Sequence, residues 1–384
     1  MSIPLHNLRV LDFSRLLPGP YCTAQLVQWG AEVIKVEHPE YGGDYNRYIP
    51  PLKDEQSYLF HLLNAGKQSV ALNWAETAAR EQLYRLVATA DVLVESFKPG
   101  AMEQWGLGPE EVRSRNPHLV YCRLTAFGQQ GNFARRPAHD LNVLALSGLL
   151  HRNAAAAAGT PAVPPLQLAD LAAGAMVATQ QILLALLERA RTGEGSVLDI
   201  SMYHNLWTLD PVGAALQEAL ARAPAAEEEL LGGQRPFYRL YATRDKRHMA
   251  VAAIEPRFWE TLCQRLGAPD LVEHHLAQGA AAQTTTERLA RLFAEKTLAE
   301  WQEIFPNGEA CVDPVLTPQE AGQWLQQHDP GYRERLQQPS SCGLPFPPSL
   351  AEPRPKRAAP TLGRDTADIL GNLPPETGEL PAAF

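Results

Sequence analysis

The sequence is poor in cysteine and contains no long uninterrupted run of apolar residues. Its 384 residues include five cysteines, which are widely spaced and form no Cys-x-x-Cys pair or Cys/His ligand pattern. Disulfide frameworks and metal sites need such spacings, so we expect neither, and a reducing compartment is favoured. No apolar run approaches the roughly 20 residues needed to span a bilayer, so no membrane partner is expected.

An excess of basic residues and a secretory leader are also missing. Lys and Arg number 34 against 43 Asp and Glu, which gives a net charge of −9. This acidic balance argues against nucleic acid as the main partner, although a local basic pocket could still hold an anion. The opening stretch MSIPLHNLRVLDF has no basic segment followed by an apolar core. We therefore expect a cytoplasmic protein.

The common signatures of nucleotide and hydrolase sites are absent as well. The chain has no GxxxxGK(S/T) phosphate loop and no GxSxG nucleophile turn, and GQQG at 128–131 is not a GxGxxG fingerprint. These absences leave phosphate-loop, dinucleotide and serine-hydrolase functions without support. An α/β protein with this sequence would bind its ligand by another route.

What is present is an alternation of short β-branched runs and helical patterns. Strands are predicted at 8–14, 31–37, 69–74, 91–97, 119–127 and 196–202, and helices at 19–30, 139–151 and 170–191. Strands separated by helices favour parallel βαβ units. Beyond them the pattern predicts a hairpin at 237–243 and 248–254, then helices at 256–266 and 284–306, and connecting segments at 152–165, 221–236 and 339–360. The second part is expected to be an α+β domain.

A histidine and two aspartates stand at the starts of two apolar helical segments. AHDLNVLALSG carries His139 and Asp140, and LQLADLAAGAM carries Asp170. An imidazole exchanges a proton near neutral pH because its ordinary pKa is about 6.5, and a carboxylate can serve as a second base or a nucleophile. Free N–H groups at the Asp170 helix start would favour a developing negative charge.

Structural roles for the same residues stay open on position alone. Asp170 could be an ordinary N-cap, and His139 a structural residue ahead of its helix. Asp140 could hold His139 or cap the helix that follows it. Glu255, directly before Pro256, could be an acid that favours a helix dipole.

Several blocks of sequence, in order, resemble CoA-transferase family III, and within it the α-methylacyl-CoA racemases. The blocks are LRVLDFSRLLPGPYCTAQLVQWGAEVIKVEHP, NAGKQSVALN, DVLVESFKPGAMEQWGLGP, LVYCRLTAFGQQG, PLQLADLAAGAMVATQQILLALLERARTGEGSVLDISM, CVDPVLTPQEA and APTLGRDTADIL. HDLNVLALSG resembles the racemase subgroup, because the transferases usually carry a Tyr-Asp pair there. PFYRLYAT and VAAIEPRFW also resemble the racemase form.

The resemblance implies roles for individual residues. His139 and Asp170 match the two catalytic bases, Glu255 the acid that pairs with the histidine, Asp140 a neighbouring acid, and Tyr238 the substrate pocket. The positions that match CoA contacts are His38, Asn64, Lys67, Ser96, Phe97, Lys98, Ala138 and Val143. The chain departs from the family in having His38 and Gln104 where arginine is usual.

The resemblance also implies an assembly. We expect an α/β protein with a large Rossmann-like domain of parallel strands at 1–220, a smaller α+β domain at 221–330, and a segment at 331–384 that returns to the large domain. Two chains would interlock as a homodimer in which the small domain of one closes the site of the other. Acyl-CoA would be the substrate, and no separate cofactor is implied.

The expected reaction is racemisation of 2-methylacyl-CoA thioesters, a step of fatty acid metabolism, by 1,1-proton transfer through an enolate. The alternative is a CoA transferase in which Asp170 attacks the thioester and forms a mixed anhydride. A transferase needs no second base, so His139 would be surplus there. A catalytically silent acyl-CoA-binding relative is disfavoured because His139, Asp170 and Glu255 are all present.

Overall fold

The computed structural model describes residues 3–53, 55–156, 160–222, 224–225, 228–306, 308–331 and 358–374. They form two compact units. The large unit comprises residues up to 147, 164–209 and the described C-terminal residues, and the small unit comprises 148–163 and 210 onward to 331. Residues 148–163 and 210–220, which were expected in the large domain at 1–220, thus belong to the small unit. The expected segment 331–384 is described only at 331 and 358–374, and the expected connection 339–360 only at 358–360.

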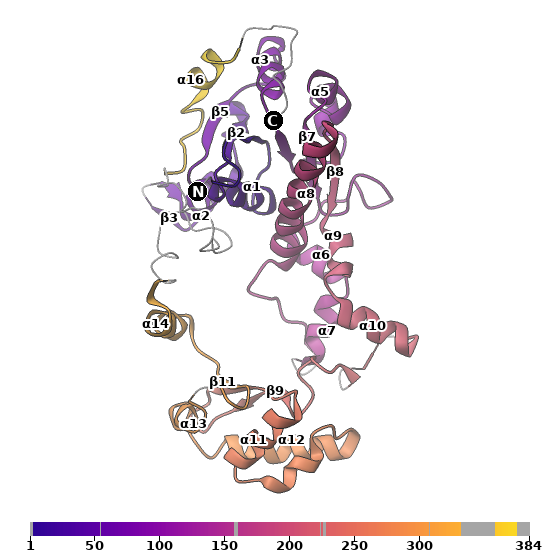
Figure 1. Ribbon diagram of the computed structural model, residues 1–384, viewed down its shortest axis with the longest axis vertical. Helices are drawn as coiled ribbons and strands as arrows, with labels where there is room; N and C mark the ends of the chain where they lie inside the picture. The colour runs from indigo at the N-terminus through magenta and orange to yellow at the C-terminus, as the bar shows by residue number, and fades with distance from the viewer. Residues whose placement is uncertain are drawn as a thin grey trace. The chain divides into compact units, whose positions relative to one another are not determined.

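The large unit is built on a sheet that, within the described residues, has six strands, all parallel (Figure 1). Their order along the sheet is β5 (Gln68–Ala71), β2 (Glu32–Glu37), β1 (Arg9–Asp12), β6 (Val92–Glu95), β7 (Val120–Thr125) and β8 (Val197–Ser201). The predicted parallel strands are confirmed. Strand order reverses between β1 and β6, and in open parallel sheets ligands bind outside the carboxyl ends of the strands at such a point.

Helices cover both faces of this sheet. Leu11 of β1 belongs to an apolar cluster with residues of α3 (Thr77–Ala88), α5 (Pro109–Arg115) and α16 (Thr366–Gly371). The next residue, Asp12, accepts a hydrogen bond from Thr23 of α1 (Pro18–Gln28) at 2.7 Å. Because successive strand residues point to opposite faces, α1 lies on the face away from α3. On its part of the sheet, α8 (Val177–Thr192) contacts β7 and β8.

Two helices predicted from the sequence, at 139–151 and 170–191, have a different form. The helix expected at 139–151 is divided into α6 (Asp140–Leu146) and α7 (Leu149–Ala156), because Gly148 between them takes φ 83°. The connection expected at 152–165 therefore begins later, since α7 includes 152–156. The helix expected at 170–191 begins with a π-helical segment, η3 (Ala169–Met176), and continues as α8.

We expected no apolar segment long enough to span a bilayer, and the helix formed by η3 and α8 shows that this expectation is wrong. Ala169–Thr192 is a single 24-residue helix that is long and apolar enough to cross a bilayer by length and composition, and 33% of its most apolar window is buried. Gln180 and Gln181 interrupt the apolar run in the sequence, but the most apolar 18-residue window of the helix has a mean hydropathy of 1.5. Core helices of globular proteins meet the same criterion, so this length and composition are weak evidence for a membrane span.

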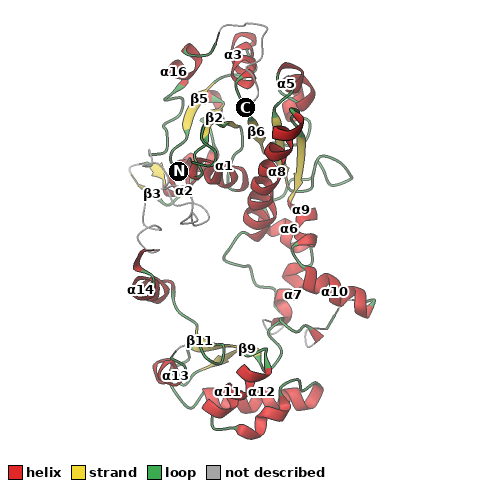
Figure 2. Ribbon diagram, viewed as in Figure 1, coloured by secondary structure: helices red, strands yellow, loops and turns green. Residues whose placement is uncertain are grey.

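The small unit holds an antiparallel sheet with helices against it (Figure 2). The predicted hairpin is confirmed: β9 (Tyr238–Ala242) pairs with β10 (His248–Ala252), which also pairs with β11 (Val312–Pro314). The helix expected at 284–306 is two helices, α12 (Gly279–Phe293) and α13 (Leu298–Ile304). The break falls where Thr297 forms a capping box with Glu300 and starts a new helix.

The remaining elements are shorter connections and surface helices. In the large unit they are η1 (Pro39–Tyr41), η2 (Tyr45–Tyr48), β3 (Leu52–Lys53), β4 (Gln56–Ser57), α2 (Tyr58–Asn64), α4 (Ala101–Gln104) and α9 (Met202–Thr208). In the small unit they are α10 (Pro211–Leu220), α11 (Pro256–Arg265), η5 (Pro269–His274) and α14 (Pro318–His328). Residues 358–374 run beside β5, where Asp365 accepts a hydrogen bond from the Ser69 N–H at 2.8 Å.

Candidate active site

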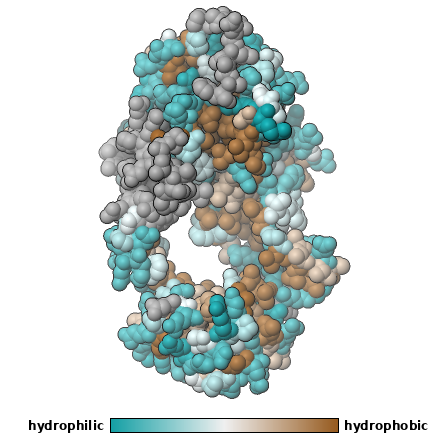
Figure 3. Space-filling model, in the orientation of Figure 1, coloured by the Kyte–Doolittle hydropathy of each residue, from teal (hydrophilic) through white to brown (hydrophobic). Residues whose placement is uncertain are grey.

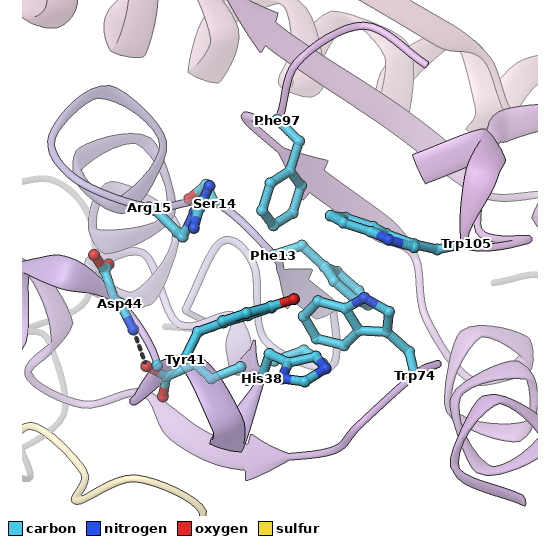
Figure 4. Close-up of a pocket in the computed structure, with 12 residues that line it drawn as sticks. Phe13, Ser14, Arg15, His38, Tyr41, Asp44, Trp74, Phe97 and Trp105 are labelled. Carbon is cyan, nitrogen blue, oxygen red and sulfur yellow. Dashed lines mark hydrogen bonds between the residues drawn. The ribbon is translucent and has the colours of Figure 1, made fainter. Parts of the chain in front are cut away.

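Two pockets open at the carboxyl ends of β1 and β6. The first, which we call the reactive pocket, has a volume of about 560 Å³ and is lined by Arg15, Leu16, Pro18, Ser96, Phe97, Lys98, Pro99, Leu124, Thr125, Ala126, Ala134, Arg135, Arg136, Pro137, Ala138, His139, Asn142, Asp170 and Met202. The second, the aromatic pocket, has a volume of about 290 Å³ and is lined by Phe13, Ser14, Arg15, Val36, Glu37, His38, Tyr41, Gly43, Asp44, Trp74, Phe97 and Trp105 (Figure 4). Both lie at the point where the strand order reverses.

Arg15 and Phe97 belong to both pockets and mark the junction between them. The Arg15 guanidinium carbon lies 4.7 Å from the centre of the Phe97 ring, and its backbone N–H donates to the Ser96 hydroxyl at 3.0 Å. The next residue, Leu16, has φ 65°, a conformation that costs a non-glycine residue energy. Asp44 holds it there by accepting from the Leu16 N–H at 3.1 Å. The loop after β1 is therefore fixed in one shape at the junction.

A cluster of fully buried charges supports this loop from below. Lys67 Nζ donates to Asp12 at 2.9 Å and to Thr23 at 2.7 Å, and Lys35 pairs with Asp44 at 2.9 Å. Burial alone would raise the pKa of Asp12, but the two lysines and hydrogen bonds to its oxygens outweigh burial and hold that pKa well below its ordinary value. Burial and the charge of Lys35 lower the pKa of Lys67. The cluster joins β1, β2 and α1 beneath the pockets.

His139 and Asp170 lie in the wall of the same reactive pocket, and Asp140 connects their two helices. The backbone N–H of His139 donates to Asn142 Oδ1 at 3.0 Å, one turn into α6. Asp140 Oδ1 accepts from the N–H groups of Ala169 and Asp170, at 2.7 and 3.0 Å. Asp140 is thus the acceptor for the start of η3, a helix about thirty residues away in sequence, and it sets where Asp170 stands relative to α6.

The Asp170 carboxyl is the titratable group that its surroundings perturb most clearly in this pocket. It lies in the first turn of η3, after Leu168 at the N-cap position, and does not cap the helix itself. Burial first, and then the nearby charge of Asp140, raises its pKa from 3.8 to about 7. At neutral pH the protonated and the ionised forms are therefore both populated, as a group that gives and takes protons requires.

The structure excludes one alternative and one expectation about this helix start. Asp170 is not an N-cap, because Asp140 supplies the acceptor. The N–H groups of Ala169 and Asp170 are also not free to stabilise an enolate oxygen, since both donate to Asp140. The long-range bond could not be read from spacing, because it joins residues on separate helices.

The structure brings most of the predicted site residues to the two pockets. His139, Asp170, Ser96, Phe97, Lys98 and Ala138 line the reactive pocket, and His38 lines the aromatic pocket. Asn64, Lys67 and Val143 are fully buried in the interior and line neither pocket, so their contact with CoA stays a prediction. Glu255, an exposed N-cap residue of α11, and Tyr238 on β9 belong to the small unit, and their roles stay predictions.

Sequence reasoning missed the aromatic walls and part of the positive charge. Phe13, Tyr41, Trp74 and Trp105 come from four separate segments, and no local pattern links them. The signal that could have been read is the basic pair Arg135 and Arg136, which stands just before His139 in the sequence. With Arg15 and Lys98 they surround the reactive pocket with four cations, against one lining acid, Asp170. The pocket is suited to a polyanionic ligand.

Comparison with known proteins extends these observations. The model of the family described as CoA-transferase family III matches residues 5–366. The chain is 37% identical to the alpha-methylacyl-CoA racemase of Mus musculus over 98% of this chain and 91% of the relative. It is 36% identical to the "Probable fatty acyl-CoA transferase Rv3272" of Mycobacterium tuberculosis, over 78% and 79%. The crystal structure of Rv3272 superposes with a TM-score of 0.78 at 32% identity, covering 95% of this chain and 99% of that one. Family model, relatives and fold agree, and the chain belongs to CoA-transferase family III.

Proposed function

We propose that this enzyme racemises 2-methylacyl-CoA thioesters by proton transfer between His139 and Asp170. The observation that carries the proposal is that an imidazole and a carboxyl with a pKa of about 7 line one pocket. Racemisation at a single carbon needs a base on one face and an acid on the other. A pair that together holds one proton can supply both in either direction.

The two pockets suit the two ends of an acyl-CoA. The flat, mostly aromatic walls around His38 and Trp74 accept a purine base, because such rings stack on one another. Arg15 at the junction faces the stretch where the diphosphate would pass, and arginine binds phosphate well. The thioester would then reach His139 and Asp170 in the reactive pocket. Lys98, Arg135 and Arg136 of the same pocket would offset the remaining negative charge of the CoA phosphates.

The proposed step moves one proton in and one out. In one direction neutral His139 removes the α-proton, the electron pair of the C–H bond becomes the enolate, and protonated Asp170 delivers a proton to the opposite face. The product differs only in configuration, and the enzyme keeps one proton on the pair. The reverse direction starts from ionised Asp170 and protonated His139. A carboxyl group with the ordinary pKa near 4 would be almost wholly ionised at neutral pH, so it could not deliver the proton when His139 acts as the base.

A CoA transferase is the second candidate, because the relatives include named CoA transferases at 31–36% identity. In that reaction ionised Asp170 attacks the thioester carbonyl, CoA leaves as its thiolate, and an acyl anhydride remains on the enzyme for an acceptor carboxylate. This route uses Asp170 and gives His139 no part in bond making. His139 in the pocket wall therefore favours the racemase.

Exchange in D₂O separates the two reactions. (2R)-2-Methylacyl-CoA, incubated with enzyme and no acceptor acid, is expected to gain deuterium at the α-carbon and lose optical purity, followed by NMR and chiral analysis. His139→Ala and Asp170→Ala should each slow both changes by orders of magnitude. Exchange that requires an added carboxylic acid, or an acyl-enzyme trapped by hydroxylamine, would establish the transferase.

We also propose that the enzyme works as a homodimer in which a partner subunit supplies Glu255 to the site. Apolar side chains lie exposed along α8, where Leu184 is 51% and Leu187 69% exposed, and Trp207 after it is 49% exposed. Figure 3 shows apolar surface over α8. Apolar surface of this kind is typical of a subunit interface. A dimer of about 84 kDa by light scattering is expected for this 42.2 kDa chain.

A further inference from the structure

We propose that His38 recognises the 6-amino group of the purine base of the substrate, through its ring atom Nδ1. This inference rests on the proposed acyl-CoA function and names an atom that selects the base. The His38 side chain is 7% exposed and lines the aromatic pocket. Among the residues that the structure describes, Nδ1 is sealed from solvent and has no hydrogen-bond partner. Buried ring nitrogens are normally satisfied, so an unfilled one in a pocket wall points to a ligand atom.

The partners of His38 determine which kind of ligand atom fits. Nε2 of the imidazole lies 2.9 Å from Oδ1 of Asn73. The Asn73 amide cannot be turned around, because its Nδ2 donates to the carboxylates of Glu40 at 3.0 Å and Glu76 at 2.9 Å. The Ala75 N–H also donates to the same Oδ1, at 3.2 Å. Oδ1 is therefore the atom that faces the imidazole, and Nε2 must carry the hydrogen.

Nδ1 of neutral His38 is consequently an acceptor. A neutral imidazole has one N–H and one lone pair, and Asn73 fixes the N–H on Nε2. The ligand atom that meets Nδ1 must then be a donor. The exocyclic amino group of adenine is a donor, whereas the oxygen at the same position of a 6-oxopurine is an acceptor and would face the lone pair.

Aromatic side chains surround the imidazole and suit a flat ligand ring. The Tyr41 ring lies over the imidazole with its centre 4.5 Å away, and Trp74 meets the imidazole edge-on at 4.9 Å (Figure 4). Tyr41 is 72% exposed and stands on a three-residue helix followed by Gly42 and Gly43, both at positive φ. An exposed side chain on so short a segment can give way to a ligand. In the proposed complex the purine meets His38 edge-on, because the Nδ1 lone pair lies in the plane of the imidazole.

The test compares CoA with deamino-CoA, in which inosine replaces adenosine, by calorimetric titration of the intact enzyme. For the wild type we expect deamino-CoA to bind about ten- to a hundredfold more weakly than CoA. The reason is that its 6-oxo oxygen is an acceptor and would face Nδ1, which is also an acceptor. His38→Phe keeps a flat ring and removes Nδ1, so the two ligands should bind within about threefold of each other. His61→Phe replaces a histidine outside both pockets and should keep the wild-type ratio.

A second variant tests the role of Asn73 as a positioning residue. Asn73→Leu leaves His38 in place but frees its tautomer, so the preference for CoA should shrink while CoA still binds. Equal affinities of the wild type for the two ligands, or a preference that survives in His38→Phe, would overturn the inference while leaving the racemase proposal standing. Absence of any CoA binding would overturn both. Loss of racemisation with the preference intact would overturn only the proposed reaction.

Discussion

At the scale of single residues, the two aspartates of the site have different duties that the sequence alone did not separate. Asp140 Oδ1 accepts hydrogen bonds from two backbone N–H groups of η3, at 2.7 and 3.0 Å. Asp170 is left without that role, and burial together with the Asp140 charge raises its pKa to about 7. One carboxylate thus organises the helix start and makes the other reluctant to ionise. A carboxyl group with a raised pKa is a common feature of acid–base catalysis.

The raised pKa has a consequence for stability. The folded chain binds a proton at Asp170 up to about pH 7, while the unfolded chain releases it above 3.8. Ionisation therefore disfavours folding as the pH rises between these values, by up to about 4 kcal/mol above pH 7. Asp170→Asn should abolish racemisation yet raise the melting temperature at pH 8, and the gain should be smaller at pH 5. A melting temperature that does not rise at pH 8 would show that the carboxyl is not held away from water.

The pH dependence of the rate separates the two reactions again. Proton transfer needs one proton shared by His139 and Asp170, so kcat/KM for racemisation should fall on both sides of an optimum near neutral pH. Nucleophilic attack needs only ionised Asp170, so a transferase would gain activity as the pH rises through about 7 and then level off. Rates measured from pH 5 to 9, with enzyme stability checked at each pH, decide between these profiles.

At the scale of elements, the loop between β1 and α1 is held by a charged interior in place of a glycine-rich turn. Lys67, Lys35 and Arg47 are matched by Asp12, Asp44 and Glu37, so the cluster has no net formal charge. Each partner is hydrogen-bonded, which offsets the cost of removing charges from water. The cluster fixes the backbone that carries Arg15 and Leu16 to the two pockets.

Replacing Lys67 or Lys98 by methionine tests which of the two lysines supports the fold and which binds substrate. Lys67→Met leaves Asp12 without its 2.9 Å partner, and the loss of one member of a buried pair costs about 3–5 kcal/mol. We expect a large fall in melting temperature. Lys98→Met, which changes an exposed lysine of the reactive pocket, should leave the melting temperature nearly unchanged and weaken CoA binding. If Lys67→Met melts normally and binds CoA poorly, Lys67 contacts the ligand after all.

At the scale of the whole molecule, the chain has two units with separate cores. The large unit carries both pockets at one edge of its parallel sheet, and the small unit packs its own apolar cluster around Trp259 and Phe293. Glu255 stands on the small unit, exposed, at the start of α11. We propose that Glu255 of one chain is the acid that pairs with His139 of the other, so that the partner subunit completes each site.

Paired variants test the crossed arrangement. Co-expressed Glu255→Ala and His139→Ala chains with different tags give a heterodimer that can be purified through both tags. If the two residues of each site come from different chains, one site carries both lesions and the other neither. The heterodimer should then show about half of the wild-type activity, well above either mutant homodimer. Activity as low as in the homodimers would place both residues of a site in one chain.

The sequence by itself determined the parallel strands, the antiparallel hairpin and the family. These follow from local signals: β-branched runs such as VLVE and VYCRLT are buried on both faces of a parallel sheet, and the order of the motif blocks runs along one chain. His139 and Asp170 could be named as candidates for the same reason, since each stands in a short characteristic motif, and the structure places both in the wall of one pocket.

Only the tertiary structure decided what those residues touch. Lys67 and Lys98 looked equivalent in sequence, yet the first is sealed among Asp12 and Thr23 and the second lines the reactive pocket. The acceptor role of Asp140 at η3, the aromatic walls and the unfilled Nδ1 of His38 all join segments that are distant in the chain. Their partners are chosen by strand order and helix packing, which no local pattern of residues encodes.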